Sequence, residues 1–542
     1  MPTGAGPKSL AALVILLAVG GCKTESVQQH DLEPIEKITL GTFTKNQYPL
    51  RYEEAILIAE SWRQLGLDVQ IEPVNFPNPV VERLFLTRDF DAFLVYFTPQ
   101  LERLEPDFFT YNTFHSANAE AGGWNLSGFE SEPFDRLAET QRREYSAERR
   151  KELVLQCQEA LYSANPWIVT VNQDELQAYN KKRFRDPVLP RSGGFKDPSA
   201  FFTIQPTGDR SVVRLAVEWS GLKTVNPLLA SESTQVRMLH FVYDTLVRLG
   251  ADTQPRLWAA TAITPIDEVT FDVTLRDDMY FHDGQLVTAE DVAFTFGFLA
   301  EYGAIYFRAA IDPIERTEVV ETRKVRFHLR HPYAPFVGYT LALVPILPRH
   351  IWSRIDEPVS SANVPPIGSG PFKFGHWKET QEILLERFDG HFQPARVDGV
   401  LVIFFGTREA AFTALRRGDA DVVDILMPHQ LAELNELDHI QTVRLPSHAV
   451  DAVVFNLRRR PFSDAQFRLA LAHATPRRQI LDELFSGYGS LGAALIAPAN
   501  EPWTHSGLEP HVYDLEKARK TLSDAGYRWD EQGRLCYGPR LE

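Results

Sequence analysis

Cysteine is scarce in this sequence, which has only Cys22, Cys157 and Cys536 among its 542 residues. A chain of this length buries enough apolar surface to fold without disulfide bonds. Cys157 lies among apolar residues at helical spacing, so we expect it in a core. The sequence leaves open whether Cys157 and Cys536 pair.

An excess of basic residues is also absent. The chain has 72 acidic against 56 basic residues and a formal net charge of -16. Nucleic-acid binding requires a basic face that neutralises phosphates, so this class of function is excluded. The acidic balance does not by itself require a cationic ligand, because most surface carboxylates are simply solvated.

Patterns typical of catalysis are missing or lack their context. Gly487, Gly489 and Gly492 satisfy G-x-G-x-x-G, but they follow a predicted helix rather than a strand. The stretch 220–223 matches S-x-x-K without its K-T-G and S-D-N companions. No H-E-x-x-H or paired Cys/His spacing occurs among the 15 histidines. We therefore predict a protein that is not an enzyme and has no cofactor or metal.

Long apolar runs are absent beyond the N-terminus. Lys8 precedes the apolar stretch Leu10 to Val19, which is too short to span a bilayer and fits the apolar region of a secretory signal. The following Val-Gly-Gly-Cys resembles the lipobox of bacterial lipoproteins. We expect a signal peptide over 1–22, lipidation at Cys22, a polar tether over 23–37 and a periplasmic or cell-surface location. An ordinary signal peptide with a coincidental cysteine is the alternative.

The remaining chain alternates strands and helices, which predicts an α/β protein. Apolar spacing predicts helices over 51–65 and 148–163, and two-residue alternation predicts strands over 67–71, 269–275 and 325–329. Thr288 and Asp514 are placed to begin helices, and Ser463 with Gln466 forms the pattern of a capping box. The stretch 186–209, rich in Pro, Gly, Ser and Asp, is expected to be irregular.

Four segments together resemble the extracellular solute-binding proteins of the peptide/nickel type, family 5. They are Tyr280–Gly284 with Thr288–Val292; Ile367–Phe374 with Trp377; Phe455–Leu457 with Pro461–Asp464; and Tyr513–Asp514 with Glu516–Ala518 and Ala525–Tyr527. Each segment is weak alone, but their order over 212–527 is typical of the family. The resemblance implies a two-lobe periplasmic-binding-protein-like fold of type II, in its large three-domain variant.

The family's final section resembles the front of this chain instead of its end. The similar segments are Asp89–Leu94, Pro106–Asp107, Phe114–Asn118, Asn125–Phe129 and Asn165–Ile168. We therefore expect a circularly permuted chain order, because permutation is tolerated where native ends lie close together on the surface. Residues 38–180 and 404–542 would form lobe II, and residues 181–403 would form lobe I. A mis-joined gene or a fragment of a tandem pair is the alternative.

The resemblance implies a monomer that closes around a peptide or similar small solute and passes it to ABC transporter permease subunits. A non-peptide ligand such as a sugar or metal chelate, a sensor partner and a periplasmic hydrolase stay as alternatives. Relatives present an aspartate and a tryptophan to the ligand's ammonium, and Glu102 and Phe97 (or Pro99) stand nearest to those positions. The other expected ligand-binding residues are Ser233, Thr234, Tyr306, Trp219, Trp124 and Trp503.

Overall fold

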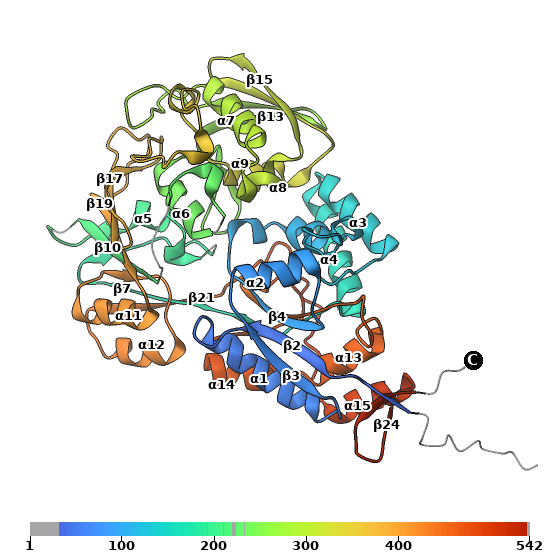
Figure 1. The fold of residues 1–542 in the computed structure, drawn as a ribbon. Helices are drawn as coiled ribbons and strands as arrows, with labels where there is room; N and C mark the ends of the chain where they lie inside the picture. The colour runs from blue at the N-terminus through green and yellow to red at the C-terminus, as the bar shows by residue number, and fades with distance from the viewer. Residues whose placement is uncertain (1–31, 192, 210, 219–223, 232, 539–542) are drawn as a thin grey trace, which may run out of the picture.

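The computed structural model describes residues 32–538 apart from 192, 210, 219–223 and 232, and it consists of two lobes (Figure 1). Both ends of the described chain contribute to one lobe, and the middle of the chain forms the other. The chain leaves the first lobe between residues 170 and 175 and returns to it between 445 and 450. We call residues 32–174 and 446–538 lobe II, and residues 175–445 lobe I.

Within the described residues, lobe II is built on a five-stranded sheet of order β3-β2-β4-β22-β5. Its strands are β2 (Ile38–Phe43), β3 (Val69–Val74), β4 (Ala92–Phe97), β5 (Trp167–Val169) and β22 (Val450–Phe455). β22 lies antiparallel between β4 and β5. Every residue of β22 is buried, as expected of a strand with both faces covered.

Helices cover both faces of the lobe II sheet. One face carries α1 (Pro49–Arg63), α13 (Ala465–His473), α14 (Arg477–Phe485) and α15 (Leu515–Asp524). The other carries α2 (Asn78–Val81), α3 (Glu132–Arg143) and α4 (Ala147–Ala164). Leu94 packs into the first layer, and its neighbours Phe93 and Val95 pack into the second, because successive strand side chains point to opposite faces.

The two described ends of the chain pair with each other. β1 (Glu33–Pro34) is antiparallel to β25 (Leu535–Tyr537), with Glu33 opposite Tyr537, and β25 pairs with β24 (Arg528–Trp529). Figure 1 shows this small sheet at the outer end of lobe II.

Lobe I contains, among its described residues, a seven-stranded sheet of order β17-β18-β19-β10-β20-β7-β21. Its strands are β7 (Glu175–Asn180), β10 (Val212–Glu218), β17 (Phe372–Lys378), β18 (Glu382–Arg387), β19 (Gly399–Phe405), β20 (Val422–Val423) and β21 (Ile440–Leu445). α11 (Arg408–Arg417) and α12 (Pro428–Asn435) pack on one face of it. α5 (Ala200–Thr203) and α6 (Ser233–Val242) belong to the core on the other.

An antiparallel sheet of order β13-β14-β16-β15 extends lobe I. Its strands are β13 (Ala260–Asp267), β14 (Thr270–Leu275), β15 (Ile314–Glu321) and β16 (Lys324–Leu329), with α7 (Ala289–Glu301) against them. The shorter elements of lobe I are α8 (Arg308–Ile311), α9 (Thr340–Leu343), α10 (Arg349–Trp352), β8 (Phe184–Arg185), β9 (Gln205–Pro206), β11 (Val247–Leu249) and β12 (Pro255–Leu257). In lobe II, β6 (Val171–Gln173) pairs with β23 (Gly489–Leu491).

The boundaries expected at 180 and 404 differ from the lobe boundaries of the structure. β7 and β21 are antiparallel partners, and β20 joins them to β10, so all three strands belong to the lobe I sheet. The physical reason is that hydrogen bonding across the sheet, rather than order along the chain, decides which lobe a strand joins.

Most of the helices and strands expected from local sequence signals are present in the structure. The expected helices 51–65 and 148–163 correspond to α1 and α4, and Thr288 caps α7 in a capping box with Asp291. The box expected at Ser463 and Gln466 is wrong: Asp464 is the N-cap of α13, and its carboxylate accepts from the Gln466 backbone N–H. Cys157 and Cys536 are both buried free thiols.

A buried ionic cluster joins the two chain segments of lobe II. The Arg51 guanidinium on α1 donates to both carboxylate oxygens of Asp451 on β22 at 2.9 Å, and lies 3.8 Å from the centre of the Tyr96 ring. Glu54, one turn along α1, accepts from the Thr170 hydroxyl at 2.5 Å. Burial, and to a lesser extent the Asp451 carboxylate, raise the pKa of Glu54 to about 8.

The raised pKa of Glu54 predicts a pH-dependent stability. In the unfolded chain the Glu54 carboxyl loses its proton near its ordinary pKa, whereas the folded protein holds the proton up to about pH 8. The contribution of the Glu54 carboxyl to the free energy of unfolding is therefore fully present at low pH and is lost as the pH rises from roughly 4.5 to 8. Glu54→Gln removes that loss, so the variant should gain about 2–3 kcal/mol relative to wild type between pH 5 and 8.

Thermal unfolding across that range measures this difference. Glu60→Gln, at an exposed position of the same helix, is the control and should follow wild type at every pH. A constant difference in Tm between Glu54→Gln and wild type would contradict the assignment.

Candidate functional site

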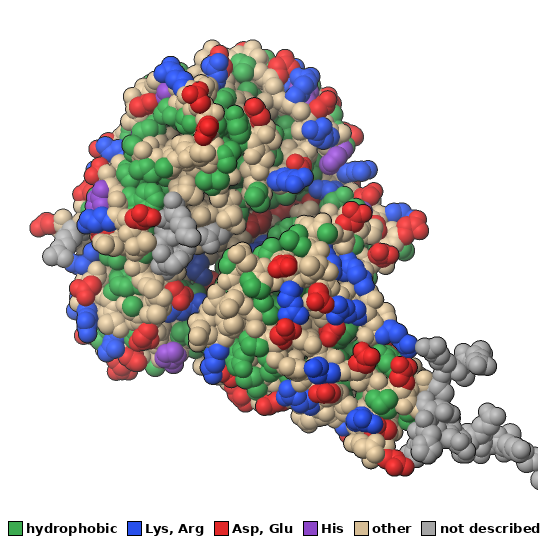
Figure 2. All heavy atoms as spheres, viewed as in Figure 1, with side chains coloured by type: hydrophobic (Ala, Val, Ile, Leu, Met, Phe, Trp, Pro, Cys, Tyr) green, Lys and Arg blue, Asp and Glu red, His purple; other side chains and the backbone are tan. Residues whose placement is uncertain are grey.

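A cavity of about 1500 Å³, including its open mouth, lies between the two lobes. Figure 2 shows the surface indented where the lobes meet. Lobe II contributes Tyr48, Tyr96 and the stretch 98–102, and lobe I contributes 196–199, Val217, Glu218, Tyr306, Asp424, Ile425 and one side of α6.

Sheet topology explains why these residues meet. β10 and β20 are parallel and end at Glu218 and Val423, so the residues at their carboxyl ends share one edge of the lobe I sheet. β4 is parallel to β2 and leads into the stretch 98–102 at the facing edge of lobe II. In open α/β sheets, ligands bind beyond the carboxyl ends of the strands. The cavity lies beyond the carboxyl end of β4 in lobe II and beyond those of β10 and β20 in lobe I.

Glu102 and Tyr306 meet across the cavity. The Tyr306 hydroxyl of lobe I lies 3.2 and 3.3 Å from the two carboxylate oxygens of Glu102 in lobe II. Burial raises the pKa of Glu102, and the positive charge of Arg103 partly opposes this shift. Burial and the Glu102 carboxylate hold the pKa of Tyr306 well above its ordinary value, so its hydroxyl keeps the proton that it donates.

Arg103 does not form an ion pair with Glu102. Its guanidinium donates to the Thr98 backbone carbonyl at 2.6 Å and to the Thr98 hydroxyl at 3.0 Å, and it lies 4.9 Å from the centre of the Phe97 ring. These contacts hold the loop that follows β4. Glu102 therefore keeps capacity to accept hydrogen bonds from a bound molecule.

The cations around the cavity have acidic partners within lobe I. The ion pairs are Lys196–Glu175 at 2.5 Å, Arg237–Asp424 at 2.6 Å, Arg248–Asp244 at 3.3 Å and Arg408–Glu218 at 2.5 Å. Across the described residues, no Lys, Arg or His lies within ion-pair distance of Glu102. This charge distribution favours a positively charged group on a ligand next to Glu102.

The structure brings four of the expected site residues together at the cavity: Glu102, Ser233, Thr234 and Tyr306. Ser233 and Thr234 lie in the first turn of α6, and Pro99 lines the cavity from lobe II. Trp219 and Cys22 lie outside the described residues.

Three expected aromatic residues are not in the cavity lining. Phe97 is buried in the lobe II core, with its ring stacked 5.6 Å from Trp167. Trp124 packs against Phe85 at 4.9 Å, and the Trp503 ring lies 5.0 Å from the Arg150 guanidinium. Phe97 occupies an inward position at the end of β4, where alternation along the strand directs its side chain into the helix-covered face.

Sequence reasoning missed the charged residues of lobe I. Lys196, Arg237, Arg248 and Asp424 stand far apart in sequence and resemble ordinary surface charges there. Only Asp424 carried a local signal, because it directly follows the short apolar strand β20.

The described residues contain neither a cluster of metal-ligating side chains nor a membrane-spanning helix. In the described part of the chain, no three or more His, Cys, Asp or Glu residues are grouped to hold a metal ion. No helix of residues 32–538, outside the gaps given above, combines the length and apolarity of a membrane span.

Two α/β lobes, two chain crossings between them and a cavity at the facing sheet edges define a two-lobe binding-protein architecture. Residues 254–540, more than half of the chain, match the family model described as bacterial extracellular solute-binding proteins, family 5 middle. The chain belongs to this family.

Comparisons with individual proteins agree with the family. Protein XP55 of Streptomyces lividans is 28% identical over 292 residues, which cover 53% of each chain. The oligopeptide-binding protein AppA of Bacillus subtilis is 26% identical over 56% of this chain and 57% of its own. The glutathione-binding protein GsiB of Shigella flexneri is 23% identical over 57% of this chain and 60% of its own. The matches thus span little more than half the length of these curated relatives.

Solved structures share the fold. NikZ from Campylobacter jejuni in complex with Ni(L-His) gives a TM-score of 0.50 at 20% identity, over 60% of this chain and 66% of its own. A putative peptide-binding protein AppA from Clostridium difficile also gives a TM-score of 0.50 at 20% identity, over 59% of this chain and 67% of its own.

Proposed function

We propose that this chain is an extracytoplasmic solute-binding lipoprotein that captures an oligopeptide or similar small solute and delivers it to an ABC uptake transporter. The observation that carries the proposal is the cavity lined by both lobes. A solute that contacts both lobes binds the closed form better than the open form, and so shifts the protein toward closure. The transporter then recognises the closed form, and no chemical step is required.

Glu102 is proposed to bind a ligand ammonium group. It forms no ion pair among the described residues, it lies at the cavity, and Tyr306 already donates to it. An ion pair formed there is less screened by water than one on the surface. Ser233 and Thr234 offer hydroxyl and backbone groups from the facing lobe. Because AppA and GsiB are named for binding an oligopeptide and glutathione, short peptides are the first class to test.

Glu102→Gln should weaken binding of a tripeptide with a free amino terminus by about tenfold or more, because the charge-assisted bond is lost. Binding should also weaken as the pH falls through the raised pKa of Glu102, and this loss should begin at a higher pH than for an exposed glutamate. Calorimetric titration with trialanine measures both effects.

The matched control is N-acetyl-trialanine, which lacks the ammonium. Wild type and Glu102→Gln should bind this peptide equally. An equal loss for both peptides would contradict ammonium recognition. If no peptide binds wild type in a thermal-shift screen that also contains sugars and metal–amino acid complexes, the best binder in that screen replaces peptides as the solute class. Turnover of a bound molecule would contradict the binding function itself.

We also propose that Cys22 carries the lipid and that the chain is a circular permutation of the family order. The adjacency of β1 and β25, and the position of β22 between β4 and β5, support permutation. Under this proposal the tether leaves from lobe II. Mass spectrometry of the membrane-extracted protein tests lipidation at Cys22.

Reversing the permutation should preserve the fold. The reordered chain would run from 211 to 538, continue through a linker of a few residues, and then run from 32 to 209. The linker would join β25 to β1, which are already antiparallel, with Glu33 opposite Tyr537. Because a short hairpin turn spans such a pair, we expect a Tm within about 5 °C of wild type, since loop changes of this size cost little.

As a control, new ends between Ala452 and Val453 would interrupt β22 and should abolish folding. Failure of the first chain and success of the control would contradict the proposal.

A further inference from the structure

Tyr145 connects the lobes at a point away from the cavity. It lies between α3 and α4 of lobe II, and its hydroxyl donates to the Glu268 backbone carbonyl at 2.7 Å and accepts from the Tyr333 backbone N–H at 3.0 Å. Glu268 lies between β13 and β14, and Tyr333 precedes the 3₁₀ turn Ala334–Phe336. The ring centre of Tyr145 is 6.0 Å from that of Phe271. One side chain thus uses both its donor and its acceptor on the backbone of the opposite lobe.

Arg142 makes a second contact between the lobes, one turn earlier on α3. Its guanidinium lies 3.6 Å from the centre of the Tyr111 ring in lobe II and 5.3 Å from that of Tyr333 in lobe I. It also pairs with Asp107 at 3.2 Å. A guanidinium between two aromatic faces is stabilised by both rings.

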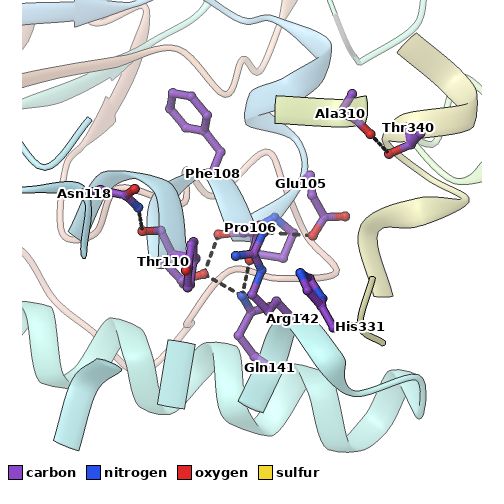
Figure 3. Close-up of polar contacts among 12 residues, drawn as sticks. Glu105, Pro106, Phe108, Thr110, Asn118, Gln141, Arg142, Ala310, His331 and Thr340 are labelled. Atoms are coloured by element: carbon purple, nitrogen blue, oxygen red, sulfur yellow. Dashed lines mark hydrogen bonds and ion pairs between the residues drawn. The ribbon is translucent and has the colours of Figure 1, made fainter. Parts of the chain in front are cut away.

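A buried network holds Arg142 in place. Gln141 donates to the Asp107 carboxylate at 2.7 Å and to the Thr110 hydroxyl at 2.9 Å, and Arg150 pairs with Glu105. Figure 3 shows Gln141 and Arg142 pointing from α3 toward the segment that carries Glu105, Pro106 and Thr110. That segment directly follows the loop at 98–102, so the contact region and one wall of the cavity share a continuous piece of chain.

None of Tyr145, Arg142, Glu268 and Tyr333 is among the described residues that line the cavity. Their contacts therefore require the lobes to be together but touch no solute. Contacts made only in the closed form raise the population of that form, and the apparent affinity for any ligand of the closed form rises in proportion.

We propose that Tyr145 and Arg142 form an interlobe latch that sets the affinity of the cavity for every solute by a common factor. The effect on affinity rests on the solute-binding function proposed above, whereas the effect on closure does not.

Tyr145→Phe tests the latch in the ligand-free protein. The variant keeps the ring and loses the hydroxyl. Because the Tyr145 side chain is exposed, this change is compatible with folding. The Tyr333 amide then lacks its acceptor, so the peptide containing it should exchange hydrogen for deuterium faster, and the radius of gyration from small-angle scattering should increase. Tyr162→Phe removes a similar hydroxyl-to-carbonyl bond, to Glu509 at 2.8 Å within lobe II, and should change neither quantity.

Binding of trialanine and trilysine provides the second measurement. Tyr145→Phe should raise both dissociation constants by the same factor, about threefold to tenfold for lost hydrogen bonds, and Tyr162→Phe should leave both unchanged. Unchanged exchange and radius in Tyr145→Phe, or a loss confined to one peptide, would overturn the latch. If neither peptide binds wild type, peptide binding fails, while the exchange and scattering results still decide the latch.

Discussion

The insertion of β22 between β4 and β5 is the interaction on which the rest of lobe II depends. β22 comes from the C-terminal part of the chain and both its neighbours from the N-terminal part, so neither part can complete the sheet alone. The Arg51–Asp451 pair fixes the same junction from α1. A buried ion pair is costly when one partner is removed, so this contact specifies how the two parts fit together as well as holding them.

The cavity follows from this junction. Because β21 leads directly into β22, and β5 and β6 lead into β7, the two chain crossings lie next to each other. Asn172 of one crossing donates to the Ala449 carbonyl of the other at 3.0 Å. With the crossings joined at one place, the carboxyl ends of β4, β10 and β20 face each other across the space that Glu102 and Tyr306 bridge. The contacts of Tyr145 and Arg142 lie outside that space and hold the lobes together without contributing to recognition.

The candidate site could be predicted in part. Glu102, Tyr306 and the Ser233–Thr234 pair were all predicted from the resemblance to the family, and Glu102 stands in the loop that directly follows the apolar strand β4. The aromatic residues were harder, because a large ring serves equally well in a core or in a binding surface. Phe97 is a core residue because its side chain points inward from β4. Trp124 packs against the Phe85 ring, and Trp503 packs against the Arg150 guanidinium, both within lobe II. The ion pairs of lobe I had no local signal, since each joins residues brought together only by the folded sheet.

Composition, periodicity and motif order by themselves determined that this chain is an α/β protein of the family 5 type, that its helices begin at residues such as Thr288 and Asp514, and that catalytic patterns are missing. These properties depend on neighbouring residues, whose spacing is visible in the chain. Only the tertiary structure decided that β7, β20 and β21 belong to lobe I, that Arg103 bonds to Thr98 and forms no ion pair with Glu102, and that Tyr145 reaches the backbone of the other lobe. These outcomes depend on hydrogen bonds between residues far apart in sequence, and local propensity carries no information about such partners.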